Sequence, residues 1–381
     1  MKSNYDVLGN HIRLIDTRNT DSVTDRVLGI NIDKFFMPSV ANVIGTDLSK
    51  YKLITKGKFA CNPMHVGRDE RLPVALYEED APAIVSPAYF MFEIIDEAVL
   101  DENYLMMWFR RPEFDRICWL HTDGSVRGGI TWDDICRLEL PVPAIKEQRE
   151  IVRNYKAITE RIAIKKQIND NLAETLDTLF NNLYQNIDDE NTLSFSELCT
   201  LASSKRVFAE DYVSEGVPFY RGKEITQKRN GEPINDPLYI SVKHYNTLKK
   251  NYGVPSSGDI LITAVGTIGN SYLVQDEDFY FKDGNIIWLK DFRNLGLNYY
   301  LYDYMQTSTF KRELEGICIG STQTALTIVA LSNLKVKVPK ESVLNTYCVN
   351  SRVIRTAIQA NNAEIIHLTM FAQSILASLS R

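Results

Sequence analysis

The sequence repeats itself once, and this repeat limits the fold more than any other feature. Residues 124–131, which begin Gly-Ser, resemble residues 320–327, which also begin Gly-Ser, 196 positions later. The same spacing separates residues 135–143, which end in Leu-Pro-Val-Pro, from residues 331–339, which end in Val-Lys-Val-Pro. A chain built from two related copies is expected to form two related units rather than one continuous core.

The repeat extends upstream into two segments that are expected to be globular. Tyr104 corresponds to Tyr300 at the same spacing, as Phe114 does to Phe310, and residues 57–59 resemble residues 258–260 at a spacing of 201. Short β-type runs at 88–94 and 259–265 are punctuated by Gly and Pro, and segments 102–110 and 297–315 have helical spacing of apolar residues. These patterns predict two mixed α/β (α+β) domains.

Each globular segment is followed by a tail without Gly or Pro, residues 144–186 and 340–381. Apolar residues recur there in alternating steps of four and three, which predicts two continuous helices about 60 Å long with a heptad seam. Packing of the helices against each other explains such a stripe more simply than a recognition role does. The predicted seam residues are Ile151, Ile158, Ile162, Leu172, Leu176, Leu179 and Leu183 in the first tail, and Ile354, Ile358, Ile365, Leu368, Ile375 and Leu379 in the second.

Mutual packing of the two tails predicts the architecture. We expect two globular domains separated by a long antiparallel two-helix coiled coil and related by a pseudo-twofold axis, with polar seam positions Lys165, Asn169 and Asn361 fixing the register. The predicted bounds are 1–143 and 192–339 for the globular domains, and 144–191 and 340–381 for the helices.

Composition favours a folded protein of the cytoplasm. Hydrophobic residues make up 44% of the 381 residues and charged residues 24%, which is ordinary for a globular chain. The six cysteines are scattered without a Cys-x-x-Cys pair, so we expect reduced thiols and no metal site. No signal-peptide segment and no stretch of about 20 apolar residues occurs, which argues against a membrane partner.

Charge is distributed unevenly along the chain, whose net charge is −6. Residues 1–143 hold 16 Lys and Arg against 22 Asp and Glu, whereas residues 192–339 hold 16 of each. Any grip on nucleic acid must therefore be local or shared with a partner.

The doubled order of Gly-Ser, hydrophobic strand, Pro-x-Pro and heptad helix resembles the specificity subunits of type I restriction-modification systems, over essentially the whole chain. Residues 147–152, Glu-Gln-Arg-Glu-Ile-Val, resemble the start of that family's conserved helix, but Val343-Leu344 stands where Glu-Gln would repeat. The resemblance implies a non-catalytic subunit whose two target recognition domains each read half of a bipartite, asymmetric site in double-stranded DNA. It also implies two modification subunits that bind S-adenosylmethionine and methylate adenine and, in some members, two ATP-driven restriction subunits, so that no cofactor is expected on this chain.

Base and phosphate contacts need polar or cationic side chains on loops, and several loops qualify. The alternative for Arg68 and Arg71 is pairing with neighbouring surface acids, and glycine turns such as 266–271 more often connect strands than bind anions. The candidate DNA contacts are Asn62, His65, Arg68, Arg71, Ser125 and Arg127 in the first domain, and Tyr220, Arg221, Lys223, Lys228, Arg229, Lys243, Thr267, Asn270, Ser321 and Gln323 in the second.

The sequence disfavours a catalytic function for this chain. A methyltransferase would need an Asn/Asp-Pro-Pro-aromatic motif, which residues 235–238 only approach, and an ATPase would need a phosphate-binding loop that the sequence lacks. A Cys61–His65 nucleophile pair has nothing to orient it. A protein-interaction scaffold, and the specificity subunit of a related type II methyltransferase-nuclease, stay open as other functions.

Overall fold

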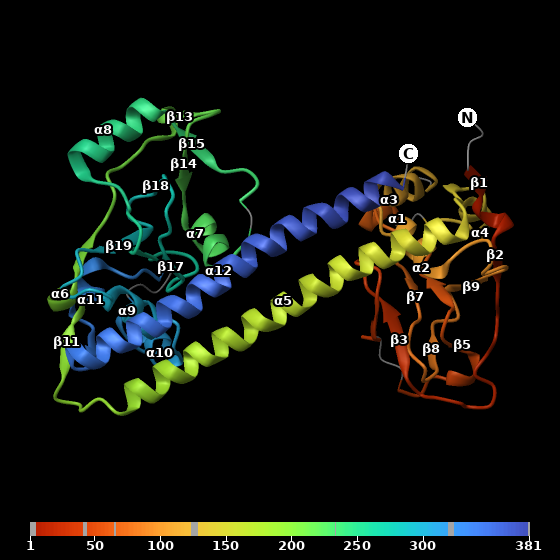
Figure 1. The fold of residues 1–381 in the computed structure, drawn as a ribbon, viewed down its shortest axis with the longest axis horizontal. Coiled ribbons are helices and arrows are strands. Elements are labelled where there is room, and N and C mark those ends of the chain that lie inside the picture. Colours follow the sequence, from red (N-terminus) through yellow and green to blue (C-terminus); the bar gives the residue numbers. More distant parts are fainter. Residues whose placement is uncertain are drawn as a thin grey trace. The chain divides into compact units, whose positions relative to one another are not determined.

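A computed structural model shows that the chain forms two compact units, each of which takes one end of both long helices. Unit 1 comprises Met1–Ile164 and Ile365–Arg381, and unit 2 comprises Lys165–Glu364 (Figure 1). The structure describes residues 5–40, 44–64, 66–122, 129–232, 234–318 and 324–379.

Unit 1 contains two four-stranded sheets and one two-stranded sheet. The first four-stranded sheet has the order β2 (Ile12–Leu14), β9 (Phe90–Ile94), β6 (Phe59–Cys61), β7 (Val74–Leu76) and is antiparallel throughout. The second has the order β4 (Phe36–Pro38), β3 (Val27–Ile30), β8 (Ala83–Val85), β5 (Lys52–Ile54), with β3 and β8 parallel. The small sheet pairs β1 (Tyr5–Val7) with β10 (Glu139–Pro141).

Unit 2 repeats this arrangement with different residues. Its antiparallel sheet has the order β12 (Thr200–Ala202), β19 (Ile286–Lys290), β16 (Ile260–Thr263), β17 (Ser271–Leu273). Its mixed sheet has the order β13 (Tyr212–Val213), β15 (Leu238–Ile240), β14 (Val217–Tyr220), β18 (Tyr280–Phe281), with β14 and β18 parallel. The small sheet pairs β11 (Thr192–Ser194) with β20 (Lys335–Lys337).

The two units therefore share a fold, and their mixed sheets differ in which edge carries the fourth strand. In unit 1 the outer strand β5 pairs with β8, whereas in unit 2 the outer strand β13 pairs with β15. The predicted mixed α/β duplication is confirmed by the common order of the other strands.

Helices at corresponding positions cover both units. Unit 1 has α2 (Glu102–Phe109), α3 (Pro112–Leu120) and α4 (Trp132–Cys136), and unit 2 has α9 (Leu297–Tyr304), α10 (Ser308–Ile317) and α11 (Ile328–Asn333). The prediction of one helical segment over 297–315 is wrong in detail. The Thr307 side chain accepts a hydrogen bond from the Phe310 N–H, so a new helix begins there.

Hydrogen bonds also repeat at the spacing seen in the sequence. The Tyr104 hydroxyl donates to the Pro141 carbonyl at 3.2 Å, and the Tyr300 hydroxyl donates to the Lys337 carbonyl at 2.6 Å. Gly57 and Gly258 both have a positive φ, of 81° and 94°, which a residue with a side chain rarely adopts. The two sequence segments therefore resemble each other because the backbone requires glycine at this position in both units.

The two tails are single helices, α5 (Ile145–Gln185) and α12 (Glu341–Ser378), drawn yellow-green and blue in Figure 1. In unit 1, Tyr155 of α5 and Ala372 of α12 belong to one buried cluster. In unit 2, contacts join Lys165 to Asn361 and the ring of Phe180 to that of Tyr347. Since numbers rise along one helix as they fall along its partner, the pair is antiparallel, as predicted.

One predicted seam position is wrong. Leu179 is 36% exposed, whereas its neighbour Phe180 is 2% exposed and packs against Tyr184 and Tyr300, with ring centroids 5.5 and 5.3 Å away. A straight helix has 3.6 residues per turn, so its buried stripe drifts away from a strict heptad. As a result, Phe180 and not Leu179 occupies the buried position on this turn of α5.

The predicted polar centre of the seam makes contacts between the helices within unit 2. Lys165 Nζ donates to Asn361 Oδ1 at 2.8 Å and pairs with Glu364 at 2.7 Å. Asn361 Nδ2 donates to Asn169 Oδ1 at 2.9 Å. A helix that slipped by one turn would separate these groups, so they fix the register.

Candidate nucleic-acid interface

The connection between β16 and β17 in unit 2 is a tight, polar loop, residues 264–270. Thr263 Oγ1 accepts from the Asn270 N–H at 3.0 Å and donates to the Thr267 carbonyl, which closes the loop on itself. Gly266 and Gly269 have φ of 78° and 89°. The loop thereby exposes Thr267 at its tip.

Helix α7 (Gly222–Arg229) holds this loop in place. Arg229 donates to Asn270 Oδ1 at 2.5 Å and to Gln306 Oε1 at 2.9 Å. Asn270 Nδ2 donates to Thr226 Oγ1 at 3.0 Å, and the hydroxyls of Thr226 and Thr267 lie 3.4 Å apart. Three predicted contacts, Arg229, Thr267 and Asn270, are therefore brought into one network. Sequence reasoning missed its other two members, Thr226 and Gln306.

Other predicted residues of unit 2 have structural partners. Tyr220 is 7% exposed and stacks on Phe279 in the core, so its prediction as a DNA contact is wrong. Lys228 pairs with Glu277 at 2.6 Å. Lys223 is exposed on the first turn of α7.

Arg221 begins α7 through a pair with Glu224. Its side chain lies 2.7 Å from the Glu224 carboxylate, which also accepts the Arg221 backbone N–H at 2.8 Å. Burial raises the pKa of the Glu224 carboxyl, but these hydrogen bonds outweigh burial and the pKa is lowered. Arg221 therefore pairs with Glu224 at the start of α7, and its side chain is not free of protein partners.

The loop between β6 and β7 in unit 1 occupies the connection that corresponds to 264–270. Asn62 Oδ1 accepts from the Met64 N–H at 3.1 Å, and Arg71 pairs with Asp33 at 2.8 Å, as the surface-pair alternative proposed. Arg68 lies in α1 (Val66–Asp69). Predicted DNA contacts of unit 1 and unit 2, which were selected from different local sequence patterns, thus lie in corresponding loops of the two units.

Each loop is also joined to the strand-like segment that follows its Gly-Ser motif. The Ile130 N–H donates to the Pro63 carbonyl at 3.2 Å, and the Leu326 N–H donates to the Ala264 carbonyl at 2.9 Å. Ile130 and Leu326 are themselves 196 positions apart. The predicted contacts His65, Ser125, Arg127, Ser321 and Gln323 lie outside the described residues.

A buried ion pair that sequence reasoning missed anchors the unit 1 loop. Lys34, only 2% exposed, donates to Asp115 Oδ1 at 2.6 Å and to the Phe109 carbonyl at 2.7 Å. Asp115 Oδ1 also accepts the N–H of Leu72, at the end of the loop, at 3.1 Å. Burial lowers the pKa of the Lys34 ammonium, and Asp115 opposes that change. Lys34 lies in a turn with a φ of 69°, and nothing in the local sequence indicates that its side chain is buried and anchors the loop.

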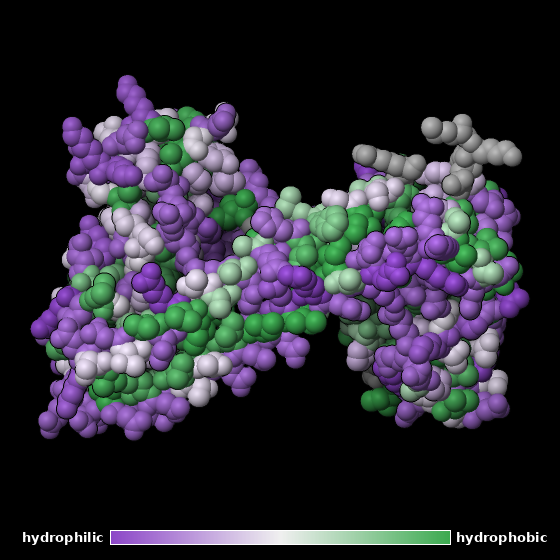
Figure 2. Space-filling view, in the orientation of Figure 1, coloured by the Kyte–Doolittle hydropathy of each residue, from purple (hydrophilic) through white to green (hydrophobic). Residues whose placement is uncertain are grey.

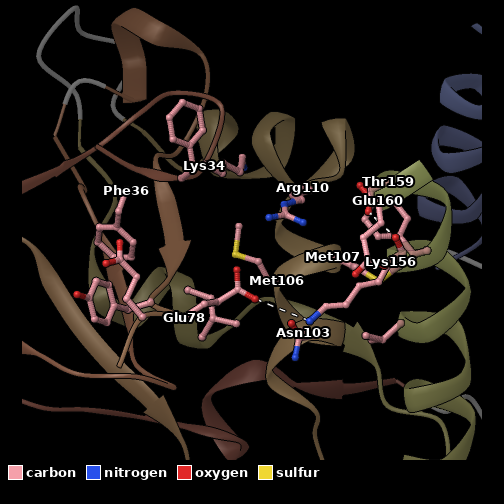
Figure 3. A pocket seen from close by; sticks show the side chains of 16 residues that line it. Lys34, Phe36, Glu78, Asn103, Met106, Met107, Arg110, Lys156, Thr159 and Glu160 are labelled. Atoms are coloured by element: carbon pink, nitrogen blue, oxygen red, sulfur yellow. Dashed lines mark hydrogen bonds and ion pairs between the residues drawn. The ribbon is translucent and has the colours of Figure 1, made fainter. Parts of the chain in front are cut away.

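Unit 1 contains a cavity of about 410 Å³ between α2 and α5 (Figure 3). Met106, Met107 and Tyr155 contribute to its lining, and at one side Lys156 reaches Glu78 at 3.8 Å. Met107 and Thr159, which also lines it, correspond to Asp303 and Arg355 in unit 2, 196 positions later, where Arg355 of α12 pairs with Asp303 of α9.

In the part of the chain that the structure describes, no group of His, Cys, Asp and Glu could hold a metal ion. No helix there has the length and hydropathy of a membrane span. All six cysteines, which lie in the described ranges, are free thiols. Burial raises the pKa of the Cys61 thiol well above its ordinary value, which disfavours a nucleophilic thiolate.

Comparisons with known proteins agree with this architecture. Residues 188–365 match the type I restriction modification DNA specificity domain. A type I restriction enzyme specificity subunit of Haemophilus influenzae is 28% identical over 225 residues, which is 57% of this chain and 55% of that protein. The alignment therefore spans about half the length of this relative.

A solved structure extends the likeness of fold to nearly the whole chain. The S subunit of a type I restriction-modification system from M. genitalium superposes with a TM-score of 0.65 at 14% identity, covering 99% of this chain and 96% of that one. Its identity is too low to carry more than the fold. Residues 188–365 thus resemble the type I restriction modification DNA specificity domain, and nearly the whole chain has the fold of an S subunit of such a system.

Proposed function

We propose that the chain is the DNA-reading subunit of a type I restriction-modification enzyme, in which each unit reads one half of a bipartite, asymmetric target. The observation that carries this proposal is the pair of corresponding loops, 62–72 and 264–270, which two copies of one fold hold by corresponding hydrogen bonds. Their side chains differ, as two readers of unrelated half-sites require.

The proposed partners are double-stranded DNA, two modification subunits and, in systems that cleave, two restriction subunits. Exposed apolar residues on the long helices support docking of protein partners, since contiguous apolar surface is typical of interfaces. Figure 2 shows hydrophobic residues following the long helices. The exposed apolar residues of α12 include Ile366, Met370 and Phe371 in unit 1 and Val349 and Val353 in unit 2. S-adenosylmethionine and ATP would bind only to those partners, and the complex would act in the cytoplasm.

A duplex titration tests the proposal. Because the chain has a net charge of −6, we expect the isolated chain to bind its labelled target weakly in moderate salt, with less than about tenfold preference over a scrambled duplex. With the modification subunit, the preference should reach about a thousandfold, as is typical of specific protein–DNA complexes. Tight, selective binding by the lone chain would contradict the sharing of the DNA grip between subunits.

The acidic first domain favours one other function, a scaffold that binds proteins only. Its 22 Asp and Glu against 16 Lys and Arg disfavour a purely electrostatic grip on DNA. The same titration separates the two functions, because a scaffold would show no preference for any duplex in the presence of the modification subunit. A specificity subunit of a type II methyltransferase-nuclease would instead retain the preference, and its complex with the nuclease would cleave near the target.

A further inference from the structure

Helix α8 (Val242–Tyr252) has no counterpart among the residues of unit 1 that the structure describes. It lies between β15 and β16, whereas the corresponding connection of unit 1, from β4 to β6, contains a short 3-10 helix at Leu48–Lys50 and strand β5. Ser241 caps its start by accepting from the His244 N–H at 3.2 Å. Tyr245 and Leu248, at 4% and 3% exposure, fix one side of α8 to the unit.

The opposite side of α8 is a polar face. Positions three, four and seven apart lie on one side of a helix, and these positions carry Lys243, Asn246, Thr247 and Lys250, all of them exposed. Lys243 and Lys250 are about 10 Å apart along the helix axis, roughly the rise of three base pairs of B-form DNA. We call these four residues the α8 face.

The electrostatics of this face are positive. Helix α8 contains no Asp or Glu, and within the described residues neither Lys243 nor Lys250 forms an ion pair. The nearby acids lie against other residues, Asp278 with Lys249 and Asp211 with His244, each at 3.8 Å. Lys205 adds a further cation, 5.4 Å from the Tyr252 ring. Hydrophilic residues dominate the region of α8 in Figure 2.

We propose that the α8 face binds the sugar-phosphate backbone of duplex DNA beside the half-site that unit 2 reads. This inference rests on the proposed function. Lys243 and Lys250 would each neutralise a phosphate, and the Asn246 amide would donate to a phosphate oxygen. Duplex DNA fits this face because its backbone is polyanionic and its closely spaced phosphate oxygens accept hydrogen bonds from cationic and amide side chains. The contact would give unit 2 a longer footprint than unit 1.

The salt dependence of DNA binding tests this face in the complex of the chain with its modification subunit. Each phosphate contact contributes about 0.9 to the slope of log affinity against log salt, so K243A/K250A should reduce that slope by about 1.8. Its affinity for the target duplex should fall about tenfold at low salt and approach that of the unaltered complex as salt rises. The control, K311A/K335A, removes the same charge from exposed positions elsewhere on unit 2 and should keep the slope.

Three further readouts make the outcome decisive. K243R/K250R should restore the slope, and hydroxyl-radical footprinting should show protection lost only beside the unit 2 half-site in K243A/K250A. An unchanged slope and footprint in K243A/K250A would overturn the α8 inference, as would a loss of modification-subunit binding in place of DNA binding. Failure of the unaltered complex to prefer its target would instead reject the proposed function.

Discussion

Replacing Arg355 by methionine is expected to destabilise unit 2 by about 3–5 kcal/mol, the usual cost of breaking a buried ion pair. The substitution leaves the Asp303 carboxylate, 5% exposed, with only the hydroxyls of Tyr347 and Ser351 at 2.6 and 3.1 Å. Urea unfolding followed by hydrogen exchange should show the loss in peptides from α9 of unit 2 and not in peptides from α2 of unit 1.

Matched variants separate loss of the pair from loss of a long side chain. Arg352→Met changes an exposed arginine of the same helix and should cost no more than about 0.5 kcal/mol. Unit 1 carries Met107 and Thr159 at the positions corresponding to Asp303 and Arg355. Asp303→Met combined with Arg355→Met should therefore recover part of the stability, because it removes the unpaired carboxylate but leaves the hydroxyls of Tyr347 and Ser351 without their acceptor. A double variant as unstable as R355M would refute this account of the pair.

Replacing Lys34 by methionine is expected to destabilise unit 1 by about 3 kcal/mol, since Asp115 loses its buried cation and keeps Arg71, at 3.6 Å, and the Leu72 N–H, at 3.1 Å. The backbone amide hydrogens of residues 62–72 should exchange faster with solvent, because Asp115 also accepts the hydrogen bond from the Leu72 N–H. In the complex, discrimination at the unit 1 half-site should weaken while discrimination at the other half-site is kept. Hydrogen exchange and half-site competition measure the two effects.

The control here is Lys56→Met, which removes an exposed lysine paired with exposed Asp80 and should change stability by no more than about 0.5 kcal/mol. Adding Asp115→Leu to K34M should recover only part of the stability. The Leu72 N–H would then be buried without an acceptor, at a cost of about 1–3 kcal/mol. Full recovery in this double variant would show that Asp115 does not anchor the loop.

The repeat in the sequence predicted the fold because it preserves backbone requirements. Tyr104 and Tyr300 keep the same hydroxyl contact, and Gly57 and Gly258 keep the same positive φ. The register of the long helices was also predictable, since a polar residue in an apolar seam needs a polar neighbour on the other helix. Lys165 and Asn361 meet this condition.

The departure of the second copy from the family motif also has a physical explanation. Gln148 is fully buried, and it accepts from the Asp101 N–H at 2.9 Å and donates to the Val99 and Pro143 carbonyls at 2.8 and 2.7 Å. Leu344, at the corresponding position, is 1% exposed and belongs to an apolar cluster. Both side chains fill the same place, one by hydrogen bonding and the other by packing.

The candidate site was less predictable, because local patterns do not show which polar groups are already paired. Tyr220 beside basic residues looked accessible, yet it packs in the core, and Lys228 is held by Glu277. The anchors of the loops, Lys34 and Gln306, are distant in sequence from the residues they hold. Only a tertiary contact distinguishes such an anchor from a reader of DNA.

The central claim is that each unit reads one half-site independently, and an exchange of units tests it most directly. Residues 192–339 would be replaced by the corresponding domain of another family member, and the variant would be expressed with its modification subunit for single-molecule methylome sequencing. We predict that one half of the methylated target changes while the other half and its modified adenine are retained. A change in both halves, or in neither, would contradict the claim.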